Sequence, residues 1–109
     1  MKNSVKNIHV EQLAQWQKEN KTFQLIDVRE PHEYRIAQIG GELIPMGDIP
    51  AQVHKIKRDR PVVVMCRSGQ RSAQVIRYLQ LHHAIDQLYN LKGGLLAYAD
   101  KIDPTLTKY

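Results

Sequence analysis

The feature that most constrains the fold is a run of four apolar residues, Val62 to Met65, which follows Pro61. A strand with one face in solvent alternates apolar and polar residues, whereas a strand buried on both faces is apolar throughout. Strands of the second kind occur in parallel sheets that helices cover on both sides. The run therefore predicts a central strand of an α/β domain.

Helix and strand patterns alternate on both sides of this run. β-prone residues predict further strands at 23–28, 43–44 and 87–91. Apolar spacing, prolines in first turns and an Asp48 cap predict helices at 10–20, 49–57, 72–81 and 95–101, and one that starts within 30–34. Residues 103–109 are expected to be an extended end. No repeat or linker divides the chain, so we expect one three-layer domain over 1–109, with a mostly parallel sheet of about five strands and helices on both faces.

Composition narrows the function classes. No stretch approaches the ~20 apolar residues that cross a bilayer, and the first residues lack the apolar segment of a signal peptide. We therefore expect a cytoplasmic protein with no membrane partner. One cysteine excludes an internal disulfide, and the five histidines show no metal-ligand spacing. No metal and no cofactor are expected.

The charge balance is basic, with 16 Lys and Arg against 11 Asp and Glu, a net charge of +5. Nucleic-acid binding would require these charges on one face beside stacking aromatic residues. The densest basic run, 55–60, contains no aromatic residue and is best interpreted as a solvated turn. We expect no nucleic-acid partner, and a small anionic ligand or an acidic partner protein fits the surplus better.

The cysteine, Cys66, stands where the predicted central strand ends and the next helix begins. In open α/β sheets, ligands bind beyond the carboxyl ends of the strands, and a helix start offers unpaired N–H groups. A turn at Gly69 can direct such groups inward around an anion. An ordinary thiol has a pKa of ~8.5, which a helix start with nearby Arg67 and Arg71 can lower enough to favour the thiolate. The loop thus predicts a nucleophilic sulfur that reacts with an anion, although a cysteine by itself is more often an inert packing residue.

Three segments, in order, resemble the rhodanese-like sulfurtransferases. Residues 63–73, VVMCRSGQRSA, resemble the active-site segment of that family, and 25–34, LIDVREPHEY, resemble its "DVRxxxE" signature. Residues 91–98, LKGGLLAY, resemble its closing "GGxxAW" element, with Tyr98 in place of tryptophan. Residues 37–42, AQIGGE, depart from the family's "GHIxGA" pattern. The ending 101–106 is most similar to rhodanese domains fused to adenylyltransferases of molybdopterin and thiamine biosynthesis.

The resemblance implies a rhodanese fold and a sulfur-transfer cycle without a cofactor. Thiosulfate or another persulfide donor would give its outer sulfur to catalytic Cys66, and an acceptor molecule or protein would then remove it. Substrate binding is implied for the rest of the loop, Arg67, Ser68, Gly69, Gln70, Arg71 and Ser72. Ser72 could instead stabilise the helix start. Structural support is expected from Asp27, Arg29 and Glu33, with Arg29 paired to Glu33, while direct contact of Asp27 with the loop is the alternative.

Two other functions stay open. Similar phosphatases and arsenate reductases carry one more residue between cysteine and arginine, whereas Cys66 to Arg71 spans six residues, the sulfurtransferase length. One residue adds up to ~3.5 Å of chain, so the shorter loop suits a single sulfur atom better than a phosphate. The second alternative is a docking module for an adenylyltransferase and sulfur-carrier system that keeps the loop but has no turnover.

Overall fold

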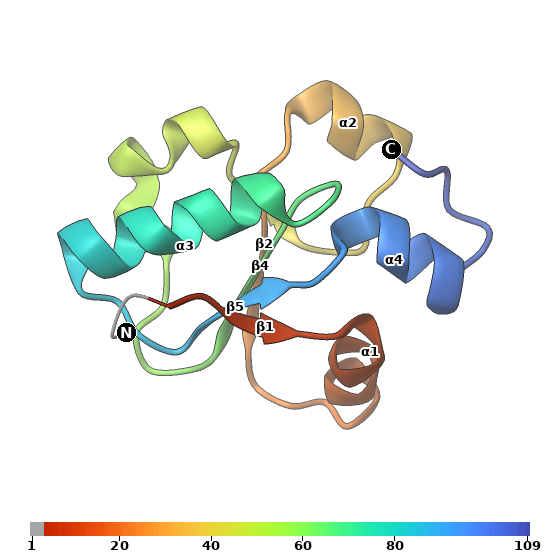
Figure 1. Cartoon of the computed structure of the whole chain (residues 1–109), viewed down its shortest axis with the longest axis horizontal. Helices are drawn as coiled ribbons and strands as arrows, with labels where there is room; N and C mark the ends of the chain where they lie inside the picture. The colour runs from red at the N-terminus through yellow and green to blue at the C-terminus, as the bar shows by residue number, and fades with distance from the viewer. Residues whose placement is uncertain (1–3) are drawn as a thin grey trace.

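The computed structural model describes residues 4–109 and contains a five-stranded parallel sheet (Figure 1). The strands lie in the order β1-β5-β4-β2-β3, and each pair of neighbours is parallel. Their bounds are β1 Lys6–Ile8, β2 Gln24–Asp27, β3 Glu42–Leu43, β4 Val62–Met65 and β5 Leu88–Leu91. The α/β class, the strand number and the parallel arrangement expected from the sequence are confirmed.

Helices cover both faces of the sheet. One face packs against α1 (Val10–Lys18) and α4 (Gly94–Lys101), and the other against α3 (Gln70–His83). Two short 3-10 segments, η1 (Met46–Asp48) and η2 (Pro50–Lys55), lie on the same face as α3. The remaining helix, α2 (Pro31–Ile36), follows the end of β2. Figure 1 shows it beyond the ends of β2 and β4, on the side where the loop that joins β4 to α3 (residues 66–69, called the Cys66 loop below) also lies.

Strand β4 lies in the middle of the sheet, and all of its residues are fully buried. Val62 and Val64 belong to the apolar cluster under α3, whereas Val63 and Met65 belong to the cluster under α1 and α4. Successive side chains of a strand point to opposite faces, so a strand covered twice has no position for a polar residue. Residues 62–65 are therefore all apolar because helices cover both faces of this strand, as the sequence pattern predicts.

Most predicted elements agree with the structure within two residues, but one strand was missed and two expectations are wrong. Strand β1 was not predicted, because only Ile8 of its three residues is buried on this sheet edge. Residues 49–57 form no α-helix capped by Asp48, since Pro50 lacks an N–H and Gln52 has a non-helical φ of −115°. The end of the chain is not extended, because residues 103–106 form a turn and Leu106 packs against the α1 and α4 cluster.

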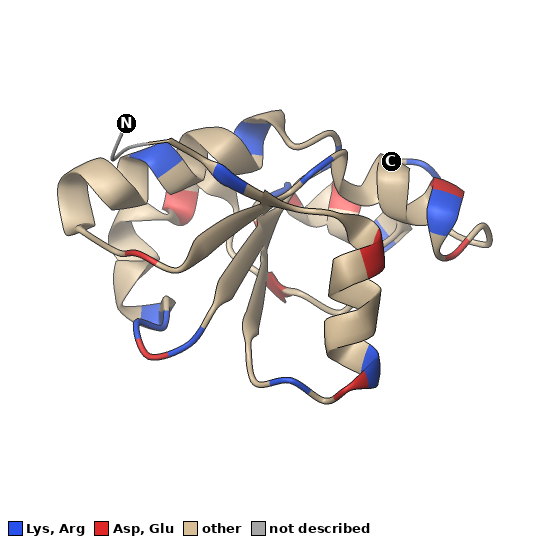
Figure 2. Ribbon diagram, turned by 60° about the horizontal axis from the view of Figure 1, so that its bottom comes forward, with Lys and Arg blue, Asp and Glu red and all other residues tan. Residues whose placement is uncertain are grey.

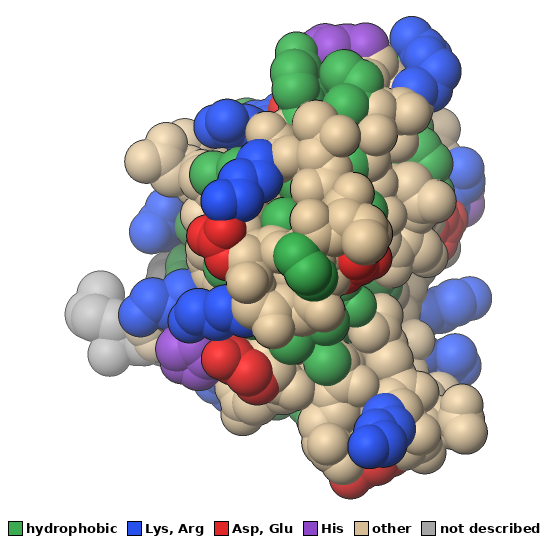
Figure 3. Space-filling view, turned by 90° about the vertical axis from the view of Figure 1, so that its right-hand side faces the viewer, with side chains coloured by type: hydrophobic (Ala, Val, Ile, Leu, Met, Phe, Trp, Pro, Cys, Tyr) green, Lys and Arg blue, Asp and Glu red, His purple; other side chains and the backbone are tan. Residues whose placement is uncertain are grey.

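The surface of the molecule mixes charges and apolar groups. Figure 2 shows Lys and Arg residues distributed over helices, strands and loops, with Asp and Glu residues between them. The face in Figure 3 carries hydrophobic side chains in small groups separated by charged and polar ones. Within residues 4–109, no helix has the length and apolar character needed to cross a membrane.

Candidate functional site: the Cys66 loop

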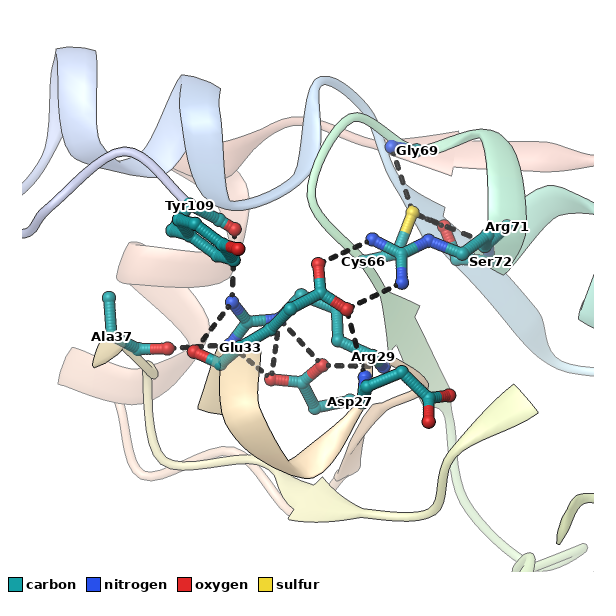
Figure 4. Close-up of polar contacts among 10 residues, drawn as sticks. Asp27, Arg29, Glu33, Ala37, Cys66, Gly69, Arg71, Ser72 and Tyr109 are labelled. Atoms are coloured by element: carbon teal, nitrogen blue, oxygen red, sulfur yellow. Dashed lines mark hydrogen bonds and ion pairs between the residues drawn. The ribbon is translucent and has the colours of Figure 1, made fainter. Parts of the chain in front are cut away.

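The loop after β4 surrounds the sulfur of Cys66 with hydrogen-bond donors (Figure 4). The Gly69 N–H donates to Sγ at an N···S distance of 3.1 Å, and the Ser72 N–H does so at 3.4 Å. The Ser72 hydroxyl oxygen lies 3.4 Å from the same sulfur. Gly69 stands at the N-cap of α3 with a φ of 101°, a conformation that costs glycine little. The first turn of a helix thereby places unpaired amides around one sulfur atom.

The start of α4 holds the other side of this loop. The Leu95 N–H donates to the carbonyl oxygen of Cys66 at 2.9 Å, and the Leu96 N–H donates to that of Arg67 at 3.1 Å. These two carbonyls therefore point away from the sulfur, toward the amides of another helix. The close approach requires glycine at position 94, where a Cβ would lie 2.3 Å from the Cys66 carbonyl oxygen. The absence of a side chain at Gly94 thus lets the start of α4 approach the loop and hold it in place.

The surroundings of Cys66 act on its pKa in opposite directions. The side chain is fully buried, next to the apolar cluster under α3, and burial raises the pKa of a thiol. Hydrogen bonds with the Ser72 hydroxyl and from the amides of Ser72, Gly69 and Ser68 outweigh burial and lower the pKa below its ordinary value. The direction agrees with the sequence-based expectation, but the causes are the hydrogen bonds of the loop rather than nearby arginines.

Burial also limits access to the sulfur. Cys66 has no exposed surface in this conformation. Arg67, Ser68 and Gln70 are exposed on the outside of the loop, whereas Gly69 and Ser72 are buried beside the sulfur. A reactant can therefore reach Sγ only after groups around the loop move.

Arg71 closes the loop through an ion pair with Glu33 of α2. Its Nη1 and Nη2 donate to Oε1 and Oε2 of Glu33 at 2.7 and 2.9 Å, the forked arrangement visible in Figure 4. Glu33 also accepts a hydrogen bond from the Glu30 N–H at 2.9 Å. The Arg71 hydrogen bonds hold the pKa of Glu33 at about 2, well below its ordinary value. Arg71 is thus neither a free surface charge nor an unpaired anion-binding group.

A second, fully buried ion pair follows β2. The Arg29 Nη2 donates to Oδ2 of Asp27 at 2.7 Å and to the Ala37 carbonyl oxygen at 2.6 Å. The expectation that Arg29 pairs with the Glu33 carboxylate is wrong, because Arg29 reaches only the Glu33 carbonyl oxygen, at 3.4 Å. The carboxylate is instead bound by Arg71. Asp27 accepts hydrogen bonds from Arg29, which also donates to the Glu33 carbonyl oxygen, and the Glu33 carboxylate in turn binds Arg71 of α3.

Asn90 of β5 is a site residue that the sequence analysis did not identify. Its Oδ1 accepts a hydrogen bond from the Ser72 hydroxyl at 2.5 Å, and its Nδ2 donates to the Gly69 carbonyl oxygen at 3.1 Å. Ser72 makes no side-chain cap of α3. A polar residue within the otherwise apolar strand 88–91 was the signal that could have identified Asn90.

The arrangement favours nucleophilic chemistry at sulfur. Lowering the pKa of a thiol increases its thiolate fraction at a given pH, and the thiolate is the reactive form. Among residues 4–109, no three His, Cys, Asp or Glu side chains come together in a group that could hold a metal ion.

The site and fold can be compared with known proteins. A family described as "Rhodanese-like domain" matches residues 9–101. A sulfurtransferase of Allochromatium vinosum is 38% identical over 96 residues, which cover 87% of this chain and 89% of the relative. The probable adenylyltransferase/sulfurtransferase MoeZ of Mycobacterium tuberculosis is 33% identical over 101 residues, or 90% of this chain but only 26% of that relative.

Structural similarity points the same way. The crystal structure of a rhodanese-like domain protein from Staphylococcus aureus superposes with a TM-score of 0.82 at 31% identity, covering 96% of this chain and 99% of that one. The family match spans the Cys66 loop, the Asp27 to Glu33 segment and the Gly93-Gly94 turn. With its parallel sheet and its cysteine at the end of the central strand, this chain belongs to the rhodanese-like domain family.

Proposed function

We propose that this protein is a sulfurtransferase that moves sulfane sulfur from thiosulfate or another persulfide donor to a thiophilic acceptor through a persulfide on Cys66. The observation that carries the proposal is the position of Sγ, which accepts hydrogen bonds from the Gly69 and Ser72 amides at the end of the central strand. The lowered pKa of the thiol supports the same chemistry. Family membership supports the reaction class.

The first step is a displacement at sulfur. The Cys66 thiolate attacks the outer sulfur of thiosulfate, so a Cys66 S–S bond forms while the S–S bond of thiosulfate breaks. Sulfite leaves with the electron pair of the broken bond. The enzyme then carries a Cys66 persulfide anion, and no external oxidant or reductant takes part.

The second step returns the enzyme to its starting state. A nucleophilic acceptor, such as cyanide or a thiolate, attacks the outer sulfur of the persulfide, and the Cys66 thiolate leaves with the electron pair of the S–S bond. One cysteine is sufficient for the cycle, because the second sulfur arrives with the donor. We assign donor and acceptor binding to the exposed side of the loop, Arg67, Ser68 and Gln70.

Intact-mass measurement tests this proposal. The protein is incubated with thiosulfate, measured, and measured again after a thiol wash. We expect a gain of one sulfur atom that the wash removes and that Cys66→Ala lacks. The absence of this gain, or an equal gain in Cys66→Ala, would refute the persulfide mechanism. We also expect no Cys66-dependent cleavage of an aryl phosphate, and such cleavage would favour a phosphatase.

A second candidate function is a sulfur relay or docking partner of an adenylyltransferase and sulfur-carrier system. It is favoured by the similarity to MoeZ, whose name pairs adenylyltransferase with sulfurtransferase and of which this chain spans about a quarter. Capture of an adenylyltransferase or sulfur-carrier protein by both the unaltered protein and Cys66→Ala, together with no turnover, would favour docking alone. Capture together with turnover would indicate a relay.

A further inference from the structure

A chain of buried side chains extends from the reactive sulfur into the sheet. Sγ of Cys66 lies 3.4 Å from Oγ of Ser72, and that hydroxyl donates to Oδ1 of Asn90 at 2.5 Å. Nδ2 of Asn90 donates to the Gly69 carbonyl oxygen at 3.1 Å and to Oδ1 of Asn7 at 3.3 Å. Ser72 is fully buried and Asn90 is 7% exposed. Water therefore has little opportunity to replace the contact between Ser72 and Asn90, whereas Asn7 at the edge of the sheet is exposed.

The orientation of the Asn90 amide follows from its neighbours. A backbone carbonyl can only accept a hydrogen bond, so the atom of Asn90 that faces the Gly69 carbonyl must be the NH2 group. The amide oxygen then faces Ser72, and because that oxygen can only accept, the Ser72 hydroxyl must be the donor. A serine hydroxyl has one hydrogen. While this hydrogen is directed to Asn90, it is not directed to the Cys66 sulfur.

From this geometry we infer that Asn90 is a positioning residue that directs the Ser72 hydroxyl hydrogen away from Cys66 until the thiol ionises. In the thiol state, the S–H group donates to Ser72 Oγ, and every member of the chain has a partner. Ionisation releases the thiol proton to water and leaves a thiolate that needs donors. The hydroxyl can then turn to the sulfur only by leaving the buried Asn90 oxygen without its donor, which costs free energy.

The inference rests on the proposed function, because the position of the Ser72 hydrogen matters for activity only if Cys66 acts as a nucleophile. A thiolate stabilised by every available donor is a weaker nucleophile, because nucleophilicity falls as the thiol pKa falls. Asn90 competes with the thiolate for the Ser72 hydroxyl hydrogen, so this hydroxyl lowers the pKa of Cys66 less than a hydroxyl without another partner would, and the two backbone amides donate in either case. The sulfur thereby keeps more of its nucleophilicity than a thiolate with three full donors would.

Other charged groups around the sulfur do not depend on Asn90. Arg71 of α3 is paired with Glu33 of α2, and after β2, Arg29 is paired with Asp27. Arg67 on the loop is exposed. The start of α4 presents backbone amides to the loop. A change at Asn90 therefore acts on the sulfur through Ser72 and Gly69.

A double-mutant cycle on the thiol pKa tests the inference. The pKa of Cys66 is measured from the ultraviolet absorbance of its thiolate, with Cys66→Ala as the baseline, in the unaltered protein, Asn90→Leu, Ser72→Ala and the double variant. We expect Asn90→Leu to lower the pKa by about one unit when Ser72 is present, because the freed hydroxyl can donate to the thiolate. In the Ser72→Ala background, we expect no such decrease.

Two further variants keep the test decisive. Asn7→Ala removes the other partner of Nδ2 but leaves Oδ1 facing Ser72, so it should leave the pKa unchanged. Ser72→Ala alone should raise the pKa of Cys66 by less than about half a unit, because the hydroxyl is held by Asn90. This measurement tests the inference even if Asn90→Leu does not fold. A rise above about half a unit would overturn the inference, as would an equal pKa change from Asn90→Leu in both backgrounds. None of these measurements requires sulfur transfer, so failure of the proposed function would be seen separately.

Discussion

The segments that follow β2 and β4 occupy equivalent places at the carboxyl edge of the sheet, but they use their polar groups differently. After β2, the polar groups bind one another, since the buried Arg29 guanidinium is bound by Asp27 and by the Ala37 and Glu33 carbonyls. After β4, the Gly69 and Ser72 amides converge on the single sulfur of Cys66. In this sheet, the segment after β2 is therefore assigned a structural role, and the adjacent loop after β4 the proposed chemical role.

In the contrast, the charged groups after β2 satisfy one another, whereas the proposed nucleophile after β4 is held mainly by backbone amides. A sulfur that is held mainly by amide donors can lose a hydrogen bond at a modest cost in free energy when a substrate binds. A buried ion pair that loses one partner is destabilised far more, because a buried charge is left unpaired. The Glu33–Arg71 pair joins the two segments, 2.7 Å between nitrogen and oxygen. Three predictions, from the largest expected effect to the smallest, can break or sharpen this comparison.

The largest effect is expected when the β2 segment loses its cation. Arg29→Met leaves the fully buried Asp27 carboxylate without its partner, which should lower the free energy of unfolding by about 3–5 kcal/mol. Urea denaturation measures this change. Because removing both charges avoids an unpaired buried ion, Asp27→Asn/Arg29→Met should recover part of the loss. A loss below about 1 kcal/mol in Arg29→Met would show that this segment is not the rigid one.

An intermediate effect is expected at the contact between α4 and the Cys66 loop. Gly94→Ala places a Cβ 2.3 Å from the Cys66 carbonyl oxygen at a φ of +56°. We expect a loss of about 2–4 kcal/mol in the free energy of unfolding, from the combined steric and backbone cost. The thiol pKa should rise as the amides turn from the sulfur. Gly47→Ala, where a Cβ meets nothing within 4 Å, is the matched control and should change stability by less than about 0.5 kcal/mol.

The smallest effect is expected at the link between the segments. Glu33→Gln removes the ion pair with Arg71 but retains an oxygen for the Glu30 amide, so we expect a loss of about 1 kcal/mol at neutral pH. Because the pKa of Glu33 is lowered from 4.5 to about 2, its contribution is present above pH 4.5 and is lost as the pH falls toward 2. Urea denaturation at several pH values should show this decline in the unaltered protein and a weaker one in Glu33→Gln. Equal declines would mean that the pair contributes nothing.

Local patterns allowed much of the fold to be predicted. The apolar run 62–65 identified the central strand, and its end located Cys66 beside the first turn of α3. Strand β1 was missed because an exposed edge strand with only Ile8 buried has little apolar signal. The 3-10 segments between 46 and 55 were missed because helical spacing does not reveal where prolines interrupt a ladder.

The site was harder to predict than the fold, because its contacts join residues far apart in sequence. The spacing of four residues suggested an Arg29–Glu33 pair, whereas the partner of the Glu33 carboxylate is Arg71, 38 positions away. Asn90 reaches Ser72 across 18 positions and Gly69 across 21, through neighbouring strands that pattern analysis cannot place. Composition and periodicity predict which residues are buried, but they do not predict which polar side chains contact one another.

The fastening of the Cys66 and Arg67 carbonyls by the start of α4 makes the acidity of the thiol depend on a late part of the chain. Until residues 93–96 have folded against the loop, the Cys66 and Arg67 carbonyls lack the amide partners that they have in the native structure. The lowered pKa of Cys66 should therefore appear only after α4 has docked on the loop, and not as soon as β4 forms.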